Sequence, residues 1–451
     1  MKHKFLTPLS LLIFTATFDI SHANSISQFL FHQSLNSTHP WPTYPQLLHA
    51  DFKPSLQFLI AGILSFFAAA ISSAGGIGGG GLFIPILTIV AGLDLKTASS
   101  YSAFMVTGGS IANVSCHMFA RRRGGGGGLI DYDIALLSEP CMLLGVSCGV
   151  IWNLMLPEWL ITIFFAVFLA WCTFKTCKSG IFFWKLESET GLERNLIENE
   201  ESGGGSNYKQ PLLKNEDEDD KGKVEIPLLK VGMLVLIWVS FFVLYLLRGN
   251  SYGQGIINVE ACGTGYWIIS SIQIPLALIF TSCILHSRKI LKNTVGAQEE
   301  NGVETRCSSS NKLFFPVMAL LAGVLGGVFG IGGGMLISPL LLQIGKEPEV
   351  TAATCSFMVL FSSVMSAMQY LLLGMEHVYG AVVFAAICFV ASLVGLTLAQ
   401  RAIMKHGRAS LIVFAVGTVM ALSTVLITSF GAVDVWKDYT SGKSMGFKKP
   451  C

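Results

Sequence analysis

The sequence predicts an all-α polytopic membrane protein made of two inverted repeats of transmembrane helices with short glycine-interrupted half-helices. Hydrophobic residues make up 52% of the 451 residues and charged residues only 13%, a composition far outside that of soluble domains. The apolar residues fall in runs of about 17 to 25, the length that spans a bilayer. A glycine-rich stretch also occurs twice at matching positions, which indicates an internal duplication.

The first 23 residues have the features of a secretory signal peptide. Met1 to Lys4 form a basic start, the apolar run 5–18 is too short to span, and small residues precede a cleavage site after Ala23. Residues 24–55 would then be a lumenal or extracellular tail, in which the sequon at Asn36 predicts N-glycosylation. We therefore expect an integral membrane glycoprotein of the secretory pathway, with the plasma membrane, Golgi and vacuole all open as destinations.

Composition divides the rest of the chain into six segments. In order, these are the first transmembrane repeat (56–176), an acidic disordered cytoplasmic loop (177–229), two linking transmembrane helices (230–286), a polar connector (287–312), the second transmembrane repeat (313–430) and a C-terminal tail (431–451). Two apolar pieces, 82–95 and 335–345, are too short to cross as ordinary helices, so full crossing and re-entry both remain open.

The basic residues predict the orientation of the spans. If the tail before residue 55 is outside and both short pieces cross, Arg121 to Arg123, Arg288 and Arg401 fall inside, as the positive-inside rule requires. Arg248 and the C-terminal lysines are exceptions that this count places outside, and re-entry of either short piece would move the C-terminus or the middle loop to the other side. In that topology the first glycine stretch follows a span running inward and the second follows one running outward. The two halves are then inverted repeats, a pattern typical of secondary transporters.

The duplicated stretch reads GIGGGGLFIP from Gly76 to Pro85 and GIGGGMLISP from Gly330 to Pro339. The offset is 330 − 76 = 254, and it continues without a gap to Ser102 and Ser356. Six of the seven residues from 75 to 81 are glycine. Because each glycine costs about 1 kcal/mol relative to alanine inside a helix, the helix is expected to break there.

A helix that restarts after the break, at Leu82 or Leu336, has first-turn amides without intrahelical partners and carries partial positive charge. Two such starts brought together by an inverted repeat predict an anion site near the midplane. The competing interpretation is close helix packing through small residues. The predicted substrate-binding residues are Gly76, Gly78, Gly79, Gly80, Gly81, Pro85, Ser102, Gly330, Gly332, Gly333, Gly334, Pro339 and Ser356.

Polar residues within the spans offer few additional candidates. Ser102 and Ser356, which the repeat aligns, either bind the ligand or hydrogen-bond to their own helices. Glu139 is the acidic residue well inside a span and is a candidate for coupling transport to an ion. It either faces protein or water within the membrane, or reaches the interface because it lies only six residues after Asp133.

Several classes of function are disfavoured. The cysteines are scattered without CxxC or Cys/His spacing, so no metal site is expected. The Gly76-x-Gly78-x-x-Gly81 pattern lacks a preceding strand, and the second copy has Met335 where Gly81 stands, so a dinucleotide site is excluded. The sequence has no basic stripe of the kind that binds nucleic acid. It also has no set of catalytic residues within the spans that would indicate an enzyme. No cofactor is expected, and the oligomeric state stays open.

The twin glycine stretches and the Thr-Ala-rich starts of the following spans resemble the TauE/SafE family of sulfite-exporter-like membrane permeases. The resemblance covers roughly 56–176 and 313–430, and the signal peptide, sequon-bearing tail and acidic loop are similar to the plant branch. It implies export of anions, with sulfite, sulfoacetate and related organosulfur compounds as substrates among bacterial members. The second copy departs from the pattern at Met335 and Ser338.

These inferences predict a secondary transporter that moves a small anion, such as sulfite or an organosulfur compound, across the lipid bilayer by alternating access. One alternative is an anion channel with the same site. A second is a non-transporting membrane receptor or scaffold that recruits partners through the acidic loop.

Overall fold

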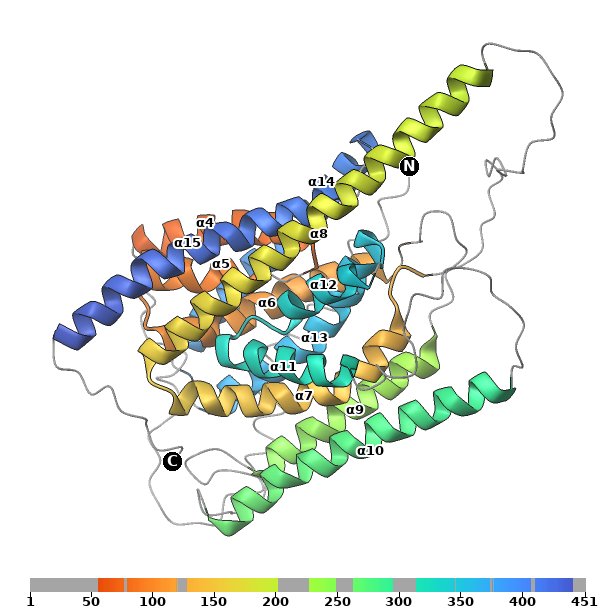
Figure 1. Cartoon of the computed structure of the whole chain (residues 1–451). Helices are drawn as coiled ribbons and strands as arrows, with labels where there is room; N and C mark the ends of the chain where they lie inside the picture. The colour runs from red at the N-terminus through yellow and green to blue at the C-terminus, as the bar shows by residue number, and fades with distance from the viewer. Residues whose placement is uncertain are drawn as a thin grey trace.

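The computed structural model describes residues 56–201, 227–248, 263–294 and 314–440, apart from gaps at 77–78, 119, 121–127, 345, 374, 376 and 407–409. The regular elements of these residues are helices, which confirms the predicted all-α class (Figure 1). The predicted signal peptide, the tail with Asn36, most of the acidic loop and most of the polar connector lie outside the described residues.

The helices follow the predicted repeat. The first half comprises α4 (Leu56–Ser73), α5 (Gly80–Pro85), the π-helix η1 (Ile86–Val90), α6 (Leu95–His117), α7 (Tyr132–Met155) and α8 (Glu158–Glu201). The linking helices are α9 (Leu228–Arg248) and α10 (Thr264–Thr294). The second half comprises α11 (Phe314–Phe329), α12 (Gly334–Gln343), α13 (Pro348–Leu372), α14 (Val378–His406) and α15 (Ser410–Thr440).

Eight of the described helices are long and apolar enough to cross a membrane by length and composition. In Figure 1, α8 and α15 lie along one side of the bundle and α9 and α10 along the opposite side, with α6, α12 and α13 between them. The long spans predicted from the sequence are therefore present, and their arrangement leaves the two glycine stretches in the interior.

Some predicted boundaries are wrong. The short helices begin at Gly80 and Gly334, two residues before the expected Leu82 and Leu336, because first-turn amides need no intrahelical partner and glycine is tolerated there. The predicted loop 177–229 begins later, since α8 continues to Glu201 through residues rich in the helix formers Leu, Lys and Glu. The tail predicted from 431 likewise begins later, because α15 continues to Thr440.

Helix α6 lies at the centre of the bundle. It is rich in serine, threonine and glycine and is not among the eight most apolar spans, yet almost all of its residues are buried. Its counterpart α13 is similarly buried. Polar side chains are expensive in contact with lipid, so helices of this composition are stable only when other helices surround them.

The two halves interlock through matched glycine contacts. A Cβ atom at Gly149 of α7 would lie 2.2 Å from the Val324 carbonyl oxygen of α11, and one at Gly395 of α14 would lie 1.9 Å from the Ala70 carbonyl oxygen of α4. The offsets are 324 − 70 = 254 and 395 − 149 = 246, and they differ because the connection before α14 is shorter than the one before α7. Each half thus packs its first helix against the other half.

Helices α8 and α15 show that the repeats are inverted. Thr173 Oγ1 lies 3.2 Å from Thr424 Oγ1, and a Cβ atom at Gly431 would lie 2.5 Å from Thr162 Cγ2, so the residue numbers run in opposite directions. A two-fold axis in the membrane plane makes equivalent helices antiparallel. The antiparallel α8–α15 pair therefore confirms the inverted arrangement.

Each short helix leads the chain back to the end of the bundle at which its repeat begins. The ring of Phe384 in α14 contacts Phe58 of α4 and Tyr101 of α6, with centroid distances of 6.4 and 6.1 Å. Helix α4 follows α14 in the same direction, because Gly62 contacts Ile387 while Gly395 packs against Ala70. Since α6 also runs with α14, from Tyr101 at Phe384 to Ala112 at Phe389, α4 and α6 start at the same end. The segment α5–η1 must therefore turn back.

The second half repeats this arrangement around α7. Helix α11 runs with α7, as the contacts of Gly145 and Gly149 with successive turns of α11 show. Helix α13 also runs with α7, because the ring of Tyr132 packs on Phe357 and the Gln369 side chain donates to Ser147 Oγ. Helix α12 therefore turns back between α11 and α13. Because each short helix returns the chain to the end where its repeat begins, it counts as a crossing, and the orientation predicted from the basic residues needs no change.

Candidate functional site

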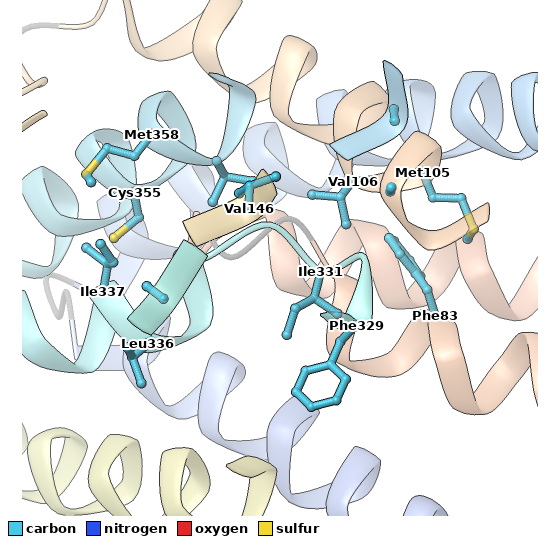
Figure 2. Packing of buried hydrophobic residues seen from close by; sticks show 14 of the residues in the cluster. Phe83, Met105, Val106, Val146, Phe329, Ile331, Leu336, Ile337, Cys355 and Met358 are labelled. Carbon is cyan, nitrogen blue, oxygen red and sulfur yellow. The ribbon is translucent and has the colours of Figure 1, made fainter. Parts of the chain in front are cut away.

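The two glycine stretches meet inside the bundle. A Cβ atom at Gly80, the first residue of α5, would lie 2.6 Å from Ile331 Cα in the second stretch. Figure 2 shows Ile331 on its connecting segment between α11 and α12, with Phe83, Val106 and Phe329 around it. The structure thus brings together the two predicted halves of the site.

The first glycine of each stretch has the same role in both repeats. Gly76 and Gly330 have φ values of 67° and 62°, a left-handed conformation that glycine adopts without penalty at the end of a helix. A Cβ atom at Gly76 would lie 2.0 Å from the Ala352 carbonyl oxygen, and one at Gly330 would lie 1.9 Å from the Ser99 carbonyl oxygen. Each stretch therefore sits against the first turns of α13 or α6 in the opposite repeat.

The later glycines differ between the repeats. Gly79, which precedes α5, has φ 79°, whereas its counterpart Gly333, which precedes α12, has φ −47°. Gly332 has φ 60°, and its counterpart Gly78 lies outside the described residues. The two connecting segments therefore have different conformations despite nearly identical sequences.

Close packing accounts for part of the glycine requirement. A Cβ atom at Gly79 would lie 2.6 Å from the Phe83 ring, and one at Gly332 would lie 3.1 Å from Val359. Among the described residues, the amides of Gly80, Gly332 and Gly333 donate to no backbone carbonyl. The glycines thus allow tight contacts, as the packing interpretation expects, at a segment where helix-start amides have no backbone acceptor in the described chain.

The prolines lie farther into the helices than expected. Pro85 and Pro339 are at the sixth position of α5 and α12 rather than in the first turn, because both helices start early. A proline there has no N–H for the carbonyl four residues before it. In the first repeat that carbonyl belongs to Gly81, and Ser423 Oγ of α15 donates a hydrogen bond to it.

The two aligned serines are not equivalent. Both side chains are buried, but Ser356 Oγ donates to the Ala352 carbonyl oxygen of its own helix at 2.9 Å. Ser102 Oγ has no hydrogen-bond partner among the described residues. Ser102 therefore keeps a donor for a ligand in this conformation, whereas Ser356 does not.

A small cavity adjoins the first glycine stretch. Its polar lining includes the hydroxyls of Thr176, Ser338 and Thr351, and Gly75 forms part of its wall. Thr351 is buried, and its Oγ1 has no partner among the described residues. Sequence reasoning did not select Thr351 as a site residue, although its alignment with Thr97 in the repeat was a usable signal.

Glu139 lies two turns into α7 and is fully buried. Neither carboxylate oxygen has a hydrogen-bond partner among the described residues. The alternative that it reaches the interface is wrong, because the helices around α7 cover it completely. Burying a charged carboxylate at membrane depth costs about 3 kcal/mol by insertion scales, so a neutral acid fits these surroundings better.

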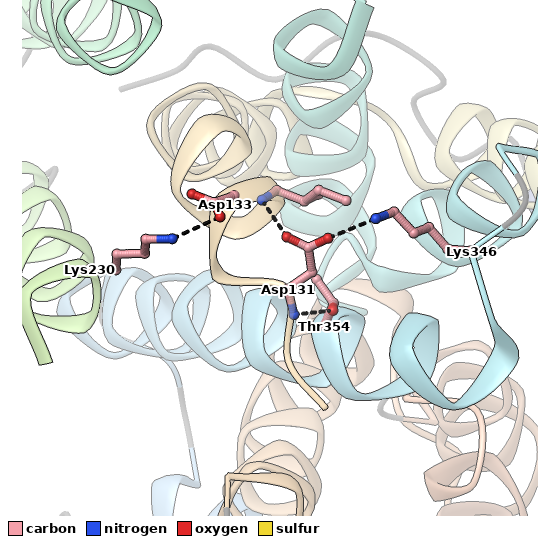
Figure 3. Close-up of polar contacts among 6 residues, drawn as sticks. Asp131, Asp133, Lys230, Lys346 and Thr354 are labelled. Atoms are coloured by element: carbon pink, nitrogen blue, oxygen red, sulfur yellow. Dashed lines mark hydrogen bonds and ion pairs between the residues drawn. The ribbon is translucent and has the colours of Figure 1, made fainter. Parts of the chain in front are cut away.

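Polar contacts close one end of the bundle near the start of α7. Asp131 Oδ2 pairs with Lys346 Nζ at 3.0 Å, and the Asp131 amide donates to Thr354 Oγ1 at 2.9 Å (Figure 3). Asp131 Oδ1 also accepts from the Ile134 amide and caps α7. One aspartate thus joins the first turn of α7 to the α12–α13 connection and to α13.

Comparison with known proteins gives a consistent result. A family model described as "Sulfite exporter TauE/SafE" matches residues 6–176 and 227–427. "Sulfite exporter TauE/SafE family protein 2" of Arabidopsis thaliana is 62% identical over 408 residues, which cover 87% of each chain. Family protein 5 of the same plant is 59% identical and covers 93% of each chain, and family protein 3 is 30% identical and covers 92% of this chain and 85% of its own. No solved structure matches.

Proposed function

The chain belongs to the sulfite exporter TauE/SafE family, and from this premise we propose that it is a secondary transporter of a small sulfur-containing anion. The relatives are named as sulfite exporters, so sulfite and organosulfur anions are the first substrates to test. The chain is an integral membrane protein, and we propose that it works in a membrane of the secretory pathway by alternating access.

The contact between Gly80 and Ile331 supports this proposal most directly. It places two helix breaks from inverted repeats against each other in the interior of the bundle. Secondary transporters bind their substrates at the interface of such repeats, where half-helix amino ends point at anionic groups. The amides of Gly80, Gly332 and Gly333, which donate to no backbone carbonyl among the described residues, supply the donors, and Ser102 Oγ supplies a further one.

The differences between the repeats support alternating access. Gly79 and Gly333 have different φ values, and Ser102 lacks the hydrogen bond that Ser356 makes. In an inverted-repeat transporter, an exchange of conformation between the two repeats converts a site open to one side into a site open to the other. In any one state of such a cycle, equivalent residues of the two repeats have different conformations.

Uptake by proteoliposomes tests the proposal. Purified protein is reconstituted, and uptake of radiolabelled sulfite, sulfate, thiosulfate and an organic sulfonate is compared with protein-free liposomes. We expect saturable uptake of one sulfur anion that excess unlabelled substrate abolishes. Ser102→Ala should raise the KM for that anion, whereas Ser240→Ala, which removes a hydroxyl of α9 bonded to its own helix, should leave it unchanged. The absence of uptake of every anion in this panel would contradict the proposed substrate class.

A further inference from the structure

Among the residues that the structure describes, Glu139 is the one aspartate or glutamate that is buried. Its side chain has no exposed surface, and its oxygens have no hydrogen-bond partner there. A carboxyl group that serves only the fold is normally paired, because an unpaired buried one destabilises the folded state. An unpaired group in this position therefore calls for a functional explanation.

The contacts between α7 and α13 set the level of Glu139 in the bundle. The Tyr132 ring packs on Phe357 with a centroid distance of 5.4 Å, and Gln369 Nε2 donates to Ser147 Oγ at 2.9 Å. Glu139 lies between Tyr132 and Ser147 on α7. Since the two helices run in the same direction with the same rise per residue, it lies at the level of the residues midway between Phe357 and Gln369.

The residues at that level on α13 border the second glycine stretch. Ser363 Oγ lies 3.5 Å from Ser110 Oγ of α6, and Ser363 Cβ would lie 3.5 Å from a Cβ atom at Gly332. Gly332 is one of the residues whose amide has no backbone acceptor in the described chain. Glu139 is therefore buried at the same depth as the proposed anion site rather than at the end of a helix.

The other ionisable groups around α7 do not neutralise Glu139. Lys230 of α9 pairs with Asp133 at the start of α7, and Glu349 lies in the first turn of α13. Helix α11 carries no titratable side chain. The remaining titratable groups with described side chains on α7 and on the helices packed against it are Tyr132, Cys141, Cys148, Tyr245, Tyr266, Cys283, His286, Cys355 and Tyr370.

We propose that Glu139 binds a proton that crosses the membrane together with the anion, so that the transporter is a proton–anion symporter. This inference rests on the proposed transport function. A carboxylate at this depth repels an anion at the glycine stretches, whereas the neutral acid does not, so proton and anion favour each other's binding. The proton passes from water to a carboxylate oxygen on one side and returns to water on the other, and no bond of the anion is made or broken.

Proteoliposomes with an imposed pH gradient test the coupling. With one proton per sulfite monoanion and an interior one pH unit more alkaline than the medium, wild-type protein should accumulate the radiolabelled monoanion to about ten times its external concentration. Protein-free liposomes should not accumulate it. Glu139→Gln should lose this accumulation yet keep exchange of internal for external sulfite, because a permanently neutral side chain permits exchange without proton release. Asp133→Asn, the same change at an exposed site on the same helix, should behave as wild type.

Three transport outcomes would overturn the inference. In the first, sulfite accumulation by the wild type does not depend on the pH gradient. In the second, Glu139→Gln accumulates sulfite as the wild type does. In the third, a folded Glu139→Gln variant loses sulfite exchange as well as accumulation. The first and second leave the proposed transport function intact. A wild type without flux of any sulfur anion in the uptake panel would instead contradict that function.

Infrared spectroscopy provides a test that does not depend on transport. The wild type near neutral pH should show the carbonyl band of a protonated carboxylic acid, and Glu139→Gln should remove it while Asp133→Asn keeps it. A wild type without that band, or a band that persists in Glu139→Gln, would overturn the assignment of the proton to Glu139.

Discussion

Ser423 of α15 donates a hydrogen bond to the carbonyl oxygen of Gly81, which Pro85 leaves without an amide partner four residues later. The contact joins the second repeat to the short helix α5 of the first. It satisfies a backbone group that lies at membrane depth, where no water replaces a missing donor.

Ser423→Ala should destabilise the protein by about 1–3 kcal/mol, because it leaves the buried Gly81 carbonyl without its donor. The measurement is the thermal unfolding temperature of purified protein in detergent. Ser240→Ala is the matched control, since the Ser240 hydroxyl is exposed and bonds to its own helix, and it should change little. Equal unfolding temperatures for Ser423→Ala and wild type would show that this hydrogen bond does not stabilise α5.

The interlocking of the repeats makes Gly395 and Gly149 sensitive to a single methyl group. Gly395→Ala places a Cβ atom 1.9 Å from the Ala70 carbonyl oxygen, so α4 and α14 must separate, and a destabilisation of about 1–3 kcal/mol is expected. Gly149→Ala should behave in the same way at the α7–α11 contact. Unfolding temperature and the yield of monodisperse protein report both effects.

Gly232→Ala is the control for these substitutions. Gly232 lies in α9, and nothing lies within 4 Å of the position of its Cβ atom. Alanine there should leave stability unchanged or raise it by roughly 0.5–1 kcal/mol, the helix preference of alanine over glycine. If Gly395→Ala were as stable as Gly232→Ala, the close α4–α14 contact would be wrong.

Asp131 should matter more than its ionic partner. Asp131→Ala removes the cap of α7 as well as the pair with Lys346, and loss of such a cap alone costs about 1 kcal/mol. Lys346→Ala removes only a partly exposed ion pair, which contributes roughly 1 kcal/mol or less. Asp131→Ala should therefore unfold at a lower temperature than Lys346→Ala, at both low and high salt. The reverse order would contradict the capping role.

The predicted sequon can be tested directly in a eukaryotic secretory host. Asn36→Gln should increase electrophoretic mobility, and glycosidase treatment should remove the difference from wild type. A mature N-terminus at Asn24, determined by mass spectrometry, would support cleavage after Ala23. A wild-type mobility that glycosidase does not change would place the segment 24–55 away from the lumen or leave Asn36 unmodified.

Much of the fold could be predicted because the membrane restricts the possibilities. Apolar runs indicate the spans, and the duplicated glycine stretch indicates both the repeat and the helix breaks. The direction of the short pieces could not be obtained in this way, because length alone does not separate crossing from re-entry. The shared contact of Phe58 and Tyr101 with Phe384 answers that question, and it depends on three helices that are distant in sequence.

The site was predicted less completely for a physical reason. The repeat aligns Ser102 with Ser356 and gives them the same expected role, but Ser356 bonds to its own helix, whereas Ser102 Oγ has no partner among the described residues. The role of Ser423 was also hidden. Pro85 indicates that a carbonyl needs a donor, but the sequence does not say which distant helix supplies it.

Counterflow is the measurement that tests alternating access most directly. Proteoliposomes preloaded with unlabelled sulfite are diluted into a trace of radiolabelled sulfite, and the initial rate is compared with that of empty proteoliposomes. A site that opens to one side at a time should give faster uptake with internal substrate and a transient overshoot. An anion channel should give an initial rate that internal substrate does not raise, and this result, with the protein demonstrably folded and conducting sulfite, would contradict the alternating-access account.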